Sequence, residues 1–132
     1  MKRFFSVPVL VLLLQACPSA EEGKIERLLG QRAEAFQEKN LALYLSCISK
    51  DYQDKEENFE KLKNRVSGHF ETFDRVDYSA WDQSIQVESK NATAIQPFRI
   101  EVEKKGNKNQ YVGREVIHLH KEGGDWKIIS GL

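Results

Sequence analysis

The hydrophobic pattern of the chain changes its period near Arg75, and this change constrains the fold more than any other feature. Before it, apolar side chains recur every three or four residues, which is typical of amphipathic helices. After it, apolar and β-branched residues alternate with polar ones, which is typical of strands with one buried face. Helices followed by strands predict an α+β domain, with the helices gathered on one face of an antiparallel sheet.

Three helices are predicted before the change of period, over residues 22–39, 41–48 and 57–73. Asn40 fits the N-cap of the second helix, because its side chain can accept a hydrogen bond from a free backbone N–H. Asp51 and Tyr52 lie in an irregular link, and Gly68 weakens the third helix. The stripes expected to face the core are Ile25, Leu29, Ala33 and Phe36 in the first helix, Leu41, Tyr44, Leu45 and Ile48 in the second, and Phe59, Leu62, Val66, Phe70 and Phe73 in the third.

About four strands are predicted after the change, over residues 76–88, 94–102, 111–121 and 126–130. Turns are expected at residues 90–91, 106–109 and 123–125. The apolar phase of the first strand shifts between Tyr78 and Ile85, which indicates a bulge. Pro97 has no N–H, so it requires an edge or an irregular site in the second strand. The third strand has Ile117 and Leu119 on one face and Val112, Val116 and His118 on the other.

The first residues of the chain have the order of an export signal. Lys2 and Arg3 precede an apolar run over residues 4–14, which is shorter than the roughly 20 residues that a membrane-spanning helix needs. The sequence Leu-Gln-Ala-Cys that ends at Cys17 resembles the lipobox of bacterial lipoproteins, in which the cysteine is acylated and becomes the new N-terminus. The alternative is an ordinary signal cut after Ala20, which places Pro18 where a small residue is required.

The lipobox divides the chain into a signal peptide (residues 1–16), a lipidated N-terminus with a short linker (residues 17–23) and one domain (residues 24–132). The resemblance implies a lipid on Cys17 that holds the protein on a membrane of the bacterial cell envelope. Because Pro18 is not an aspartate, the periplasmic leaflet of the outer membrane is expected rather than the inner membrane. Cys47 is then the one remaining cysteine, and its apolar helical setting predicts a small buried side chain.

The charge of the mature chain argues against nucleic acid as a partner. Removing Lys2 and Arg3 leaves 18 basic residues against 20 acidic residues, a net charge of −2, so no basic excess is available to neutralise phosphates. No glycine-rich phosphate loop occurs either, and no cofactor is predicted.

The helices and the C-terminal strands together resemble a known superfamily. The residues that carry the resemblance are Phe36, Asn40, Tyr44, Asp51 and Tyr52 in the helical half, and the run from Leu119 to Ile128, a strand followed by Lys-Glu, a glycine turn and Trp-Lys-Ile. This pattern resembles the nuclear-transport-factor-2-like superfamily, which includes SnoaL-like cyclases and ketosteroid isomerases. The resemblance implies a curved sheet wrapped round the helices as a cone, with a pocket at the wide end. Since the superfamily contains enzymes and binding proteins, the fold does not decide the function.

Alternation along the strands predicts which side chains face this pocket. Glu115 shares the concave face with Ile117, and Gln96 shares it with Phe98. The candidate ligand-binding residues are Tyr44, Trp81, Gln96 and Glu115.

Glu115 and Tyr44 are also the candidate catalytic residues. A carboxylate beside aromatic rings can have a raised pKa, so Glu115 is a candidate general base and Tyr44 a candidate hydrogen-bond donor. In the alternative, Glu115 pairs with Arg99 or Arg114 or lies at a solvated mouth, and Tyr44 is a core aromatic. The isomerases of the superfamily use a tyrosine on the first helix, where this chain has Arg32 and Ala33.

The other face of the third strand carries two further candidate features. His118 and His120 lie two residues apart and could share a metal ion, although no third ligand is predictable, and the alternative is a solvated pair. Exposed Val112 and Val116 indicate an interface, and the resemblance implies a homodimer through this face.

Three hypotheses for function follow from the sequence. The leading one is a noncatalytic envelope lipoprotein whose domain binds a small apolar or amphiphilic ligand or a partner protein. The alternative is a SnoaL-like lyase or isomerase that uses Glu115. The third is a structural dimeric module.

Overall fold

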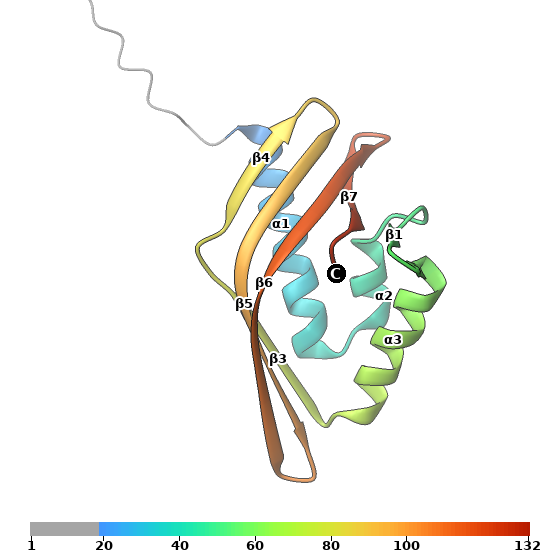
Figure 1. Ribbon diagram of the computed structural model, residues 1–132, viewed down its shortest axis with the longest axis vertical. Helices are drawn as coiled ribbons and strands as arrows, with labels where there is room; N and C mark the ends of the chain where they lie inside the picture. The colour runs from blue at the N-terminus through green and yellow to red at the C-terminus, as the bar shows by residue number, and fades with distance from the viewer. Residues whose placement is uncertain (1–18) are drawn as a thin grey trace, which may run out of the picture.

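The computed structural model describes residues 19–132, and these residues form the predicted α+β fold (Figure 1). The export signal and Cys17 lie outside the described residues. Three helices lie on one side of a five-stranded antiparallel sheet. The helices are α1 (Ala20–Glu38), α2 (Leu41–Ser46) and α3 (Phe59–Thr72), and the sheet strands are β3 (Arg75–Ala80), β4 (Ser84–Glu88), β5 (Asn91–Lys104), β6 (Asn107–Glu122) and β7 (Asp125–Ser130).

Capping side chains set where the helices begin. Ser19 accepts a hydrogen bond from the Glu22 N–H, so α1 starts at Ala20, two residues before the predicted start. Asn40 caps α2 as predicted, accepting from the Leu43 N–H. The predicted irregular link after α2 contains a small hairpin of β1 (Gln53–Asp54) and β2 (Glu57–Asn58). Because residue 57 pairs within this hairpin, α3 begins later than predicted.

The strand predicted over residues 76–88 is divided into β3 and β4, which pair end to end with β5. Between these two ladders, the three residues 81–83 lie opposite the two residues 96–97, so the predicted extra residue is present. Pro97 lies opposite this break, where the missing N–H costs no ladder hydrogen bond. The turn between β4 and β5 falls at residues 89–90, one residue earlier than predicted.

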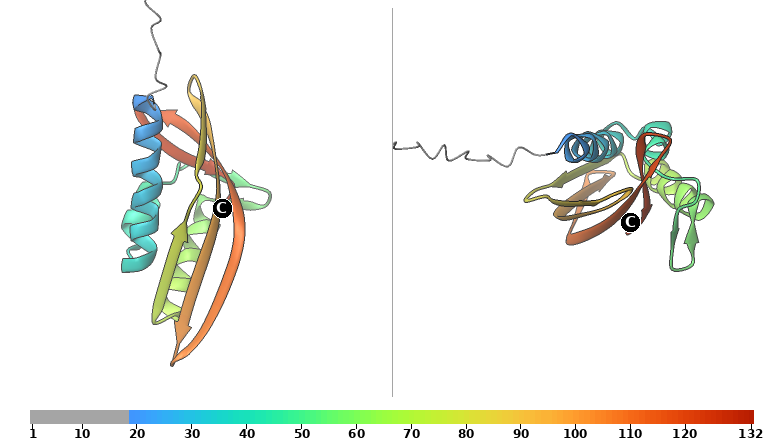
Figure 2. Two further views of the ribbon diagram at one scale, coloured as in Figure 1. Left: turned by 90° about the vertical axis from the view of Figure 1, so that its left-hand side faces the viewer. Right: turned by 90° about the horizontal axis from the view of Figure 1, so that it is seen from above.

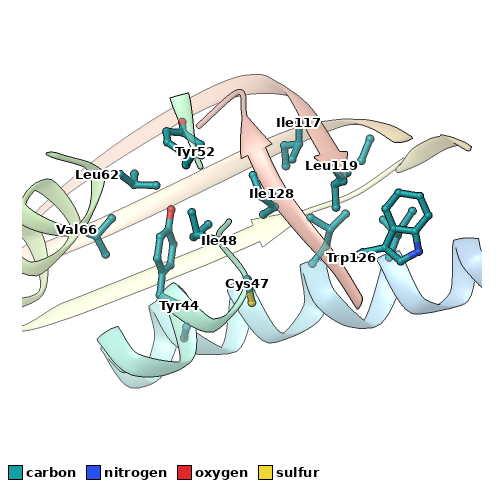
Figure 3. Packing of buried hydrophobic residues seen from close by; sticks show 14 of the residues in the cluster. Tyr44, Cys47, Ile48, Tyr52, Leu62, Val66, Ile117, Leu119, Trp126 and Ile128 are labelled. Carbon is teal, nitrogen blue, oxygen red and sulfur yellow. The ribbon is translucent and has the colours of Figure 1, made fainter. Parts of the chain in front are cut away.

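The sheet curves round the helices, as the two turned views in Figure 2 show. Its concave face and the helices enclose the hydrophobic core (Figure 3). Ile117 and Leu119 are buried there as predicted, whereas Val112 (65% exposed) and Val116 (41% exposed) lie on the convex face. Cys47 is buried as expected, and burial raises the pKa of its thiol.

All of these elements and the core cluster lie within residues 19–132, so this segment carries the complete fold described here. None of its helices has the length and apolar character needed to cross a membrane.

Candidate functional site

A cavity of about 290 Å³ lies between the helices and the concave face of the sheet. Aromatic rings form much of its wall, and two arginines and one carboxylate lie among them. The lining residues are Arg32, Phe36, Tyr44, Arg65, Val66, His69, Tyr78, Phe98, Ile100, Tyr111, Glu115 and Leu132.

A buried ion pair lies in the wall of this cavity. Arg32 on α1 contacts Glu115 on β6 through two hydrogen bonds, from Nη2 to Oε1 at 2.9 Å and from Nη1 to Oε2 at 3.2 Å. Both side chains are almost completely buried. This bidentate geometry holds the two charges together away from water, which is the arrangement in which a buried pair is tolerated.

Two further side chains complete the hydrogen bonding of Glu115. The Tyr78 hydroxyl donates to Oε2 at 2.5 Å, and the Gln96 amide donates to the same oxygen at 3.0 Å. Gln96 also donates to the Tyr78 hydroxyl at 2.9 Å. Gln83, in the break between β3 and β4, donates to Gln96 Oε1 at 2.7 Å. This last bond fixes the Gln96 amide so that its NH₂ group points to Glu115.

The surroundings of Glu115 lower its pKa. Burial alone would raise the pKa, but the charge of Arg32 and the hydrogen bonds from Arg32, Tyr78 and Gln96 outweigh it. The same contacts hold Arg32 protonated, and burial raises the pKa of Tyr78. The raised pKa expected for a catalytic Glu115 is therefore not found, because a guanidinium faces the carboxylate.

Aromatic rings surround the Arg32 guanidinium. Its central carbon lies 5.1 Å from the ring centre of Tyr78, 5.2 Å from that of Phe36 and 5.8 Å from that of Tyr44. Phe36 and Tyr78 stack on each other with centres 4.9 Å apart. Within residues 19–132, the Arg32 Nε has no hydrogen-bond partner. The rings thus hold the cation from the sides while Glu115 binds its far end.

Tyr44 contributes a hydroxyl that the protein does not use. The residue is only 2% exposed and lines the cavity, and its ring projects from α2 between Val66 and Ile48 (Figure 3). The hydroxyls of Tyr52 and Tyr78 both make hydrogen bonds. The Tyr44 hydroxyl makes none with any of the described residues. The buried side-chain polar atoms without a partner in residues 19–132 include Arg32 Nε but not the Tyr44 hydroxyl, so this hydroxyl is accessible from the cavity.

The structure brings three of the four sequence-predicted ligand residues together, since Tyr44 and Glu115 line the cavity and Gln96 supports Glu115. Trp81 lies in the break between β3 and β4, is 44% exposed and does not line the cavity.

The sequence interpretation missed Arg32 and Tyr78. Arg32 lies on the buried stripe of α1, three residues after Leu29, whereas Ala33, the predicted core position, is half-buried. An arginine at the spacing of the apolar stripe is the sequence signal that could have identified it as a buried, paired side chain. The predicted partners of Glu115, Arg99 and Arg114, are wrong, because strand alternation places both on the convex face.

The two strand histidines have neighbours of their own on the convex face. His118 Nδ1 lies 3.4 Å from the Thr93 hydroxyl, and His120 Nδ1 lies 3.0 Å from Asn91 Oδ1. In the part of the chain that the structure describes, no three histidine, cysteine or acidic side chains lie together as a metal site would require.

Comparison with known proteins identifies the fold but no close relative. Neither protein-family models nor curated protein sequences match the chain. A solved structure of a proposed scytalone dehydratase from Novosphingobium aromaticivorans matches with a TM-score of 0.74 and 14% identity, over 84% of this chain and 80% of the other. A proposed dehydratase of the nuclear-transport-factor-2-like family from Streptomyces avermitilis matches with a TM-score of 0.73 and 9% identity, over 87% and 95%.

A third similar structure comes from a different functional class. It is a proposed calcium/calmodulin-dependent protein kinase II association domain from Xanthomonas campestris, with a TM-score of 0.70 and 16% identity, over 88% of this chain and 89% of the other. At these identities the likeness concerns the fold alone. The chain therefore has the nuclear-transport-factor-2-like fold predicted from its sequence.

Proposed function

We propose that this protein is a membrane-tethered envelope lipoprotein whose cone binds a small amphiphilic ligand without transforming it. The observation that carries the proposal is the Tyr44 hydroxyl, which lies in the cavity wall, is open to the cavity and has no hydrogen-bond partner among residues 19–132. A ligand with a polar atom at this point would satisfy the hydroxyl, and its apolar body would cover the aromatic walls. Pockets that bind small molecules have this composition, mostly apolar with a few placed polar groups.

The state of Glu115 supports a noncatalytic role. Its two oxygens already accept four hydrogen bonds, from Arg32 twice and from Tyr78 and Gln96 once each. A general base works best with a pKa near the working pH, whereas the pKa of Glu115 is lowered. The carboxylate is consequently a poor proton acceptor and serves to hold Arg32 in the wall.

The alternative is a lyase- or isomerase-type enzyme that uses Glu115. The similarity to two proposed dehydratases brings this class into consideration. It requires a substrate that displaces Arg32 from Glu115 before a proton can be taken. No specific contact in the described residues favours this rearrangement, so binding is the better-supported function.

A neutral fluorescent amphiphile, N-phenyl-1-naphthylamine, tests the binding proposal. We expect residues 19–132 to bind it with increased fluorescence, and Tyr44→Phe to weaken binding by about 3- to 10-fold, the effect of one lost hydrogen bond. The matched control is Trp81→Phe, which alters an aromatic residue outside the cavity and should leave the affinity unchanged. Absence of binding, or equal affinity in Tyr44→Phe and the unsubstituted protein, would refute the proposal.

The tether belongs to the same proposal. Its support is the lipobox-like sequence ending at Cys17, which stands only two residues before the Ser19 cap of α1. The lipid would hold the first turn of α1 close to the bilayer, with the outer-membrane periplasmic leaflet as the expected place. The binding domain then stays at the membrane surface.

The convex sheet face is proposed as a homodimer interface. Val112 and Val116 are exposed there on the same face of β6, with Arg114 between them, and apolar surface of this kind is typical of contacts between proteins. Sedimentation equilibrium should give a dimer mass that Val116→Glu reduces to that of a monomer. A monomer at every concentration of the unsubstituted protein would exclude the dimer.

A further inference from the structure

A second hollow, of about 340 Å³, lies at the far end of the β5–β6 hairpin. Figure 1 shows this hairpin extending beyond the end of α3, so its tip has no helix packed against it. The hollow has an apolar floor and a polar rim. Its lining residues are Phe73, Val102, Lys104, Lys105, Asn107 and Asn109.

This hollow follows directly after the cone cavity along the same wall. Ile100 and Tyr111 form a cross-strand pair that lines the cavity. The next two pairs on that face, Val102 with Asn109 and Lys104 with Asn107, line the hollow.

The helix side shows the same succession. His69 of α3 lines the cavity, and Phe73, one turn further on, lines the hollow. The two rings lie 6.1 Å apart between their centres. The cavity and the hollow are therefore neighbouring parts of one concave surface.

The two parts differ in charge. In the cavity, Arg32 is paired with Glu115 and Arg65 with Glu57. The hollow is lined by Lys104 and Lys105 and by no acidic side chain.

The neighbours of the hollow leave it cationic. Lys39 adds a third ammonium group beside it, since its Nζ donates to the Phe73 carbonyl at 3.0 Å. The nearby carboxylate of Asp74 accepts a hydrogen bond from the Lys105 backbone N–H at 2.8 Å. Among these neighbours of the hollow, Lys39, Lys104 and Lys105 supply three ammonium groups and Asp74 supplies one carboxylate.

We propose that the ligand of this protein is an anionic amphiphile, with its apolar body in the cone and its anionic head against Lys104 and Lys105. This inference rests on the proposed binding function and adds the chemical class of the ligand. Four residues of a strand span roughly 13 Å at about 3.3 Å per residue, so the ligand needs a body on the order of ten carbon atoms to reach from Ile100 to Lys104. A medium-chain carboxylate that carries a second polar atom along its chain, to meet the Tyr44 hydroxyl, has this form.

Calorimetric titration of residues 19–132 with decanoate and with decanamide tests the assignment. The two probes have the same chain, and only decanoate is charged. We expect decanoate to bind roughly 3- to 10-fold more tightly at low ionic strength, and salt to reduce this difference because the contacts with the lysines are exposed. The double variant Lys104→Gln/Lys105→Gln should bind both probes with equal affinity.

Lys108→Gln is the matched control, because Lys108 lies in the same hairpin, pairs with Glu101 and does not line the hollow. It should keep the preference for decanoate. Equal binding of both probes by the unsubstituted protein, or a preference that survives in the double variant, would overturn the anionic-head proposal while leaving cone binding intact. Failure of both probes and of N-phenyl-1-naphthylamine to bind would overturn the binding function itself.

Discussion

At the scale of single residues, Arg32 decides the character of the site. It occupies a position on the apolar stripe of α1 and is 3% exposed, although a charged side chain is costly to bury. Glu115 compensates for this cost through two hydrogen bonds, and three aromatic rings cover the guanidinium. The pair is therefore a structural unit whose two members depend on each other.

Glu115→Gln tests this dependence. The substitution leaves the Arg32 charge buried without a counter-ion, and we expect the free energy of unfolding to fall by about 3–5 kcal/mol in urea denaturation at neutral pH. The control is Asp77→Asn, which breaks the exposed pair with Arg75 and should change stability by less than about 1 kcal/mol. Equal losses of unfolding free energy for the two substitutions would show that the buried pair stabilises the fold no more than the exposed pair does.

The lowered pKa of Glu115 also predicts that the free energy of unfolding depends on pH, which the same variant can test. Because the pKa of Glu115 is lowered in the folded state, the unfolded chain takes up a proton first as the pH falls. The stability from this carboxylate is complete above its ordinary pKa and is lost as the pH falls toward its folded pKa. The stability difference between the unsubstituted protein and Glu115→Gln should therefore narrow as the pH falls below the ordinary pKa of a glutamate side chain. A constant difference would contradict the pairing.

At the scale of elements, the pairing of β5 with β6 shapes the cavity wall. Gly113 on β6 lies opposite Phe98 on β5. A Cβ atom at Gly113 would lie 2.9 Å from Phe98 Cε1, closer than carbon atoms approach without strain. The absence of a side chain at this position lets the Phe98 ring lie against the neighbouring strand and leaves the cavity open.

Gly113→Ala should therefore push the Phe98 ring into the cavity. We expect a loss of about 1–3 kcal/mol in unfolding free energy, as for other overpacked sites, and weaker binding of N-phenyl-1-naphthylamine. Gly68→Ala in α3 is the contrasting variant. Nothing lies within 4 Å of its added methyl group, and it should stabilise the helix by about 0.5–1 kcal/mol without affecting binding. Binding by Gly113→Ala equal to that of the unsubstituted protein would show that Phe98 does not limit the cavity.

At the scale of the whole molecule, the start of α1 and the tip of the β5–β6 hairpin lie at opposite ends of the long axis (Figure 1). Under the proposed tether, the membrane holds the first end and the lysine-lined hollow points away from it. The ligand would then be exchanged on the side facing away from the bilayer.

Metabolic labelling with palmitate tests the tether in cells. The unsubstituted protein should incorporate the label, and Cys17→Ala should not, because the acylated sulfur is lost. Cys47→Ala is the matched control, since Cys47 is buried in the core and should leave labelling unchanged. If Cys17→Ala still incorporates the label, Cys17 is not the acylated residue and the proposed tether is refuted.

The sequence alone determined the elements of this fold and the faces they present. Periodicity separates the helices from the strands, Asn40 marks the start of α2, and alternation places Glu115 on the concave face. These features depend on neighbours within a few residues, so local patterns are sufficient to predict them.

Only the tertiary structure decided the site. Arg32 and Glu115 are 83 residues apart in the chain, and periodicity shows which face each occupies but not which residue stands opposite. The succession from the cavity to the lysine-lined hollow depends equally on the register of β5 against β6 and on where α3 ends. Contacts of this kind are set when the curved sheet closes round the helices, because that closure brings together side chains from distant parts of the chain.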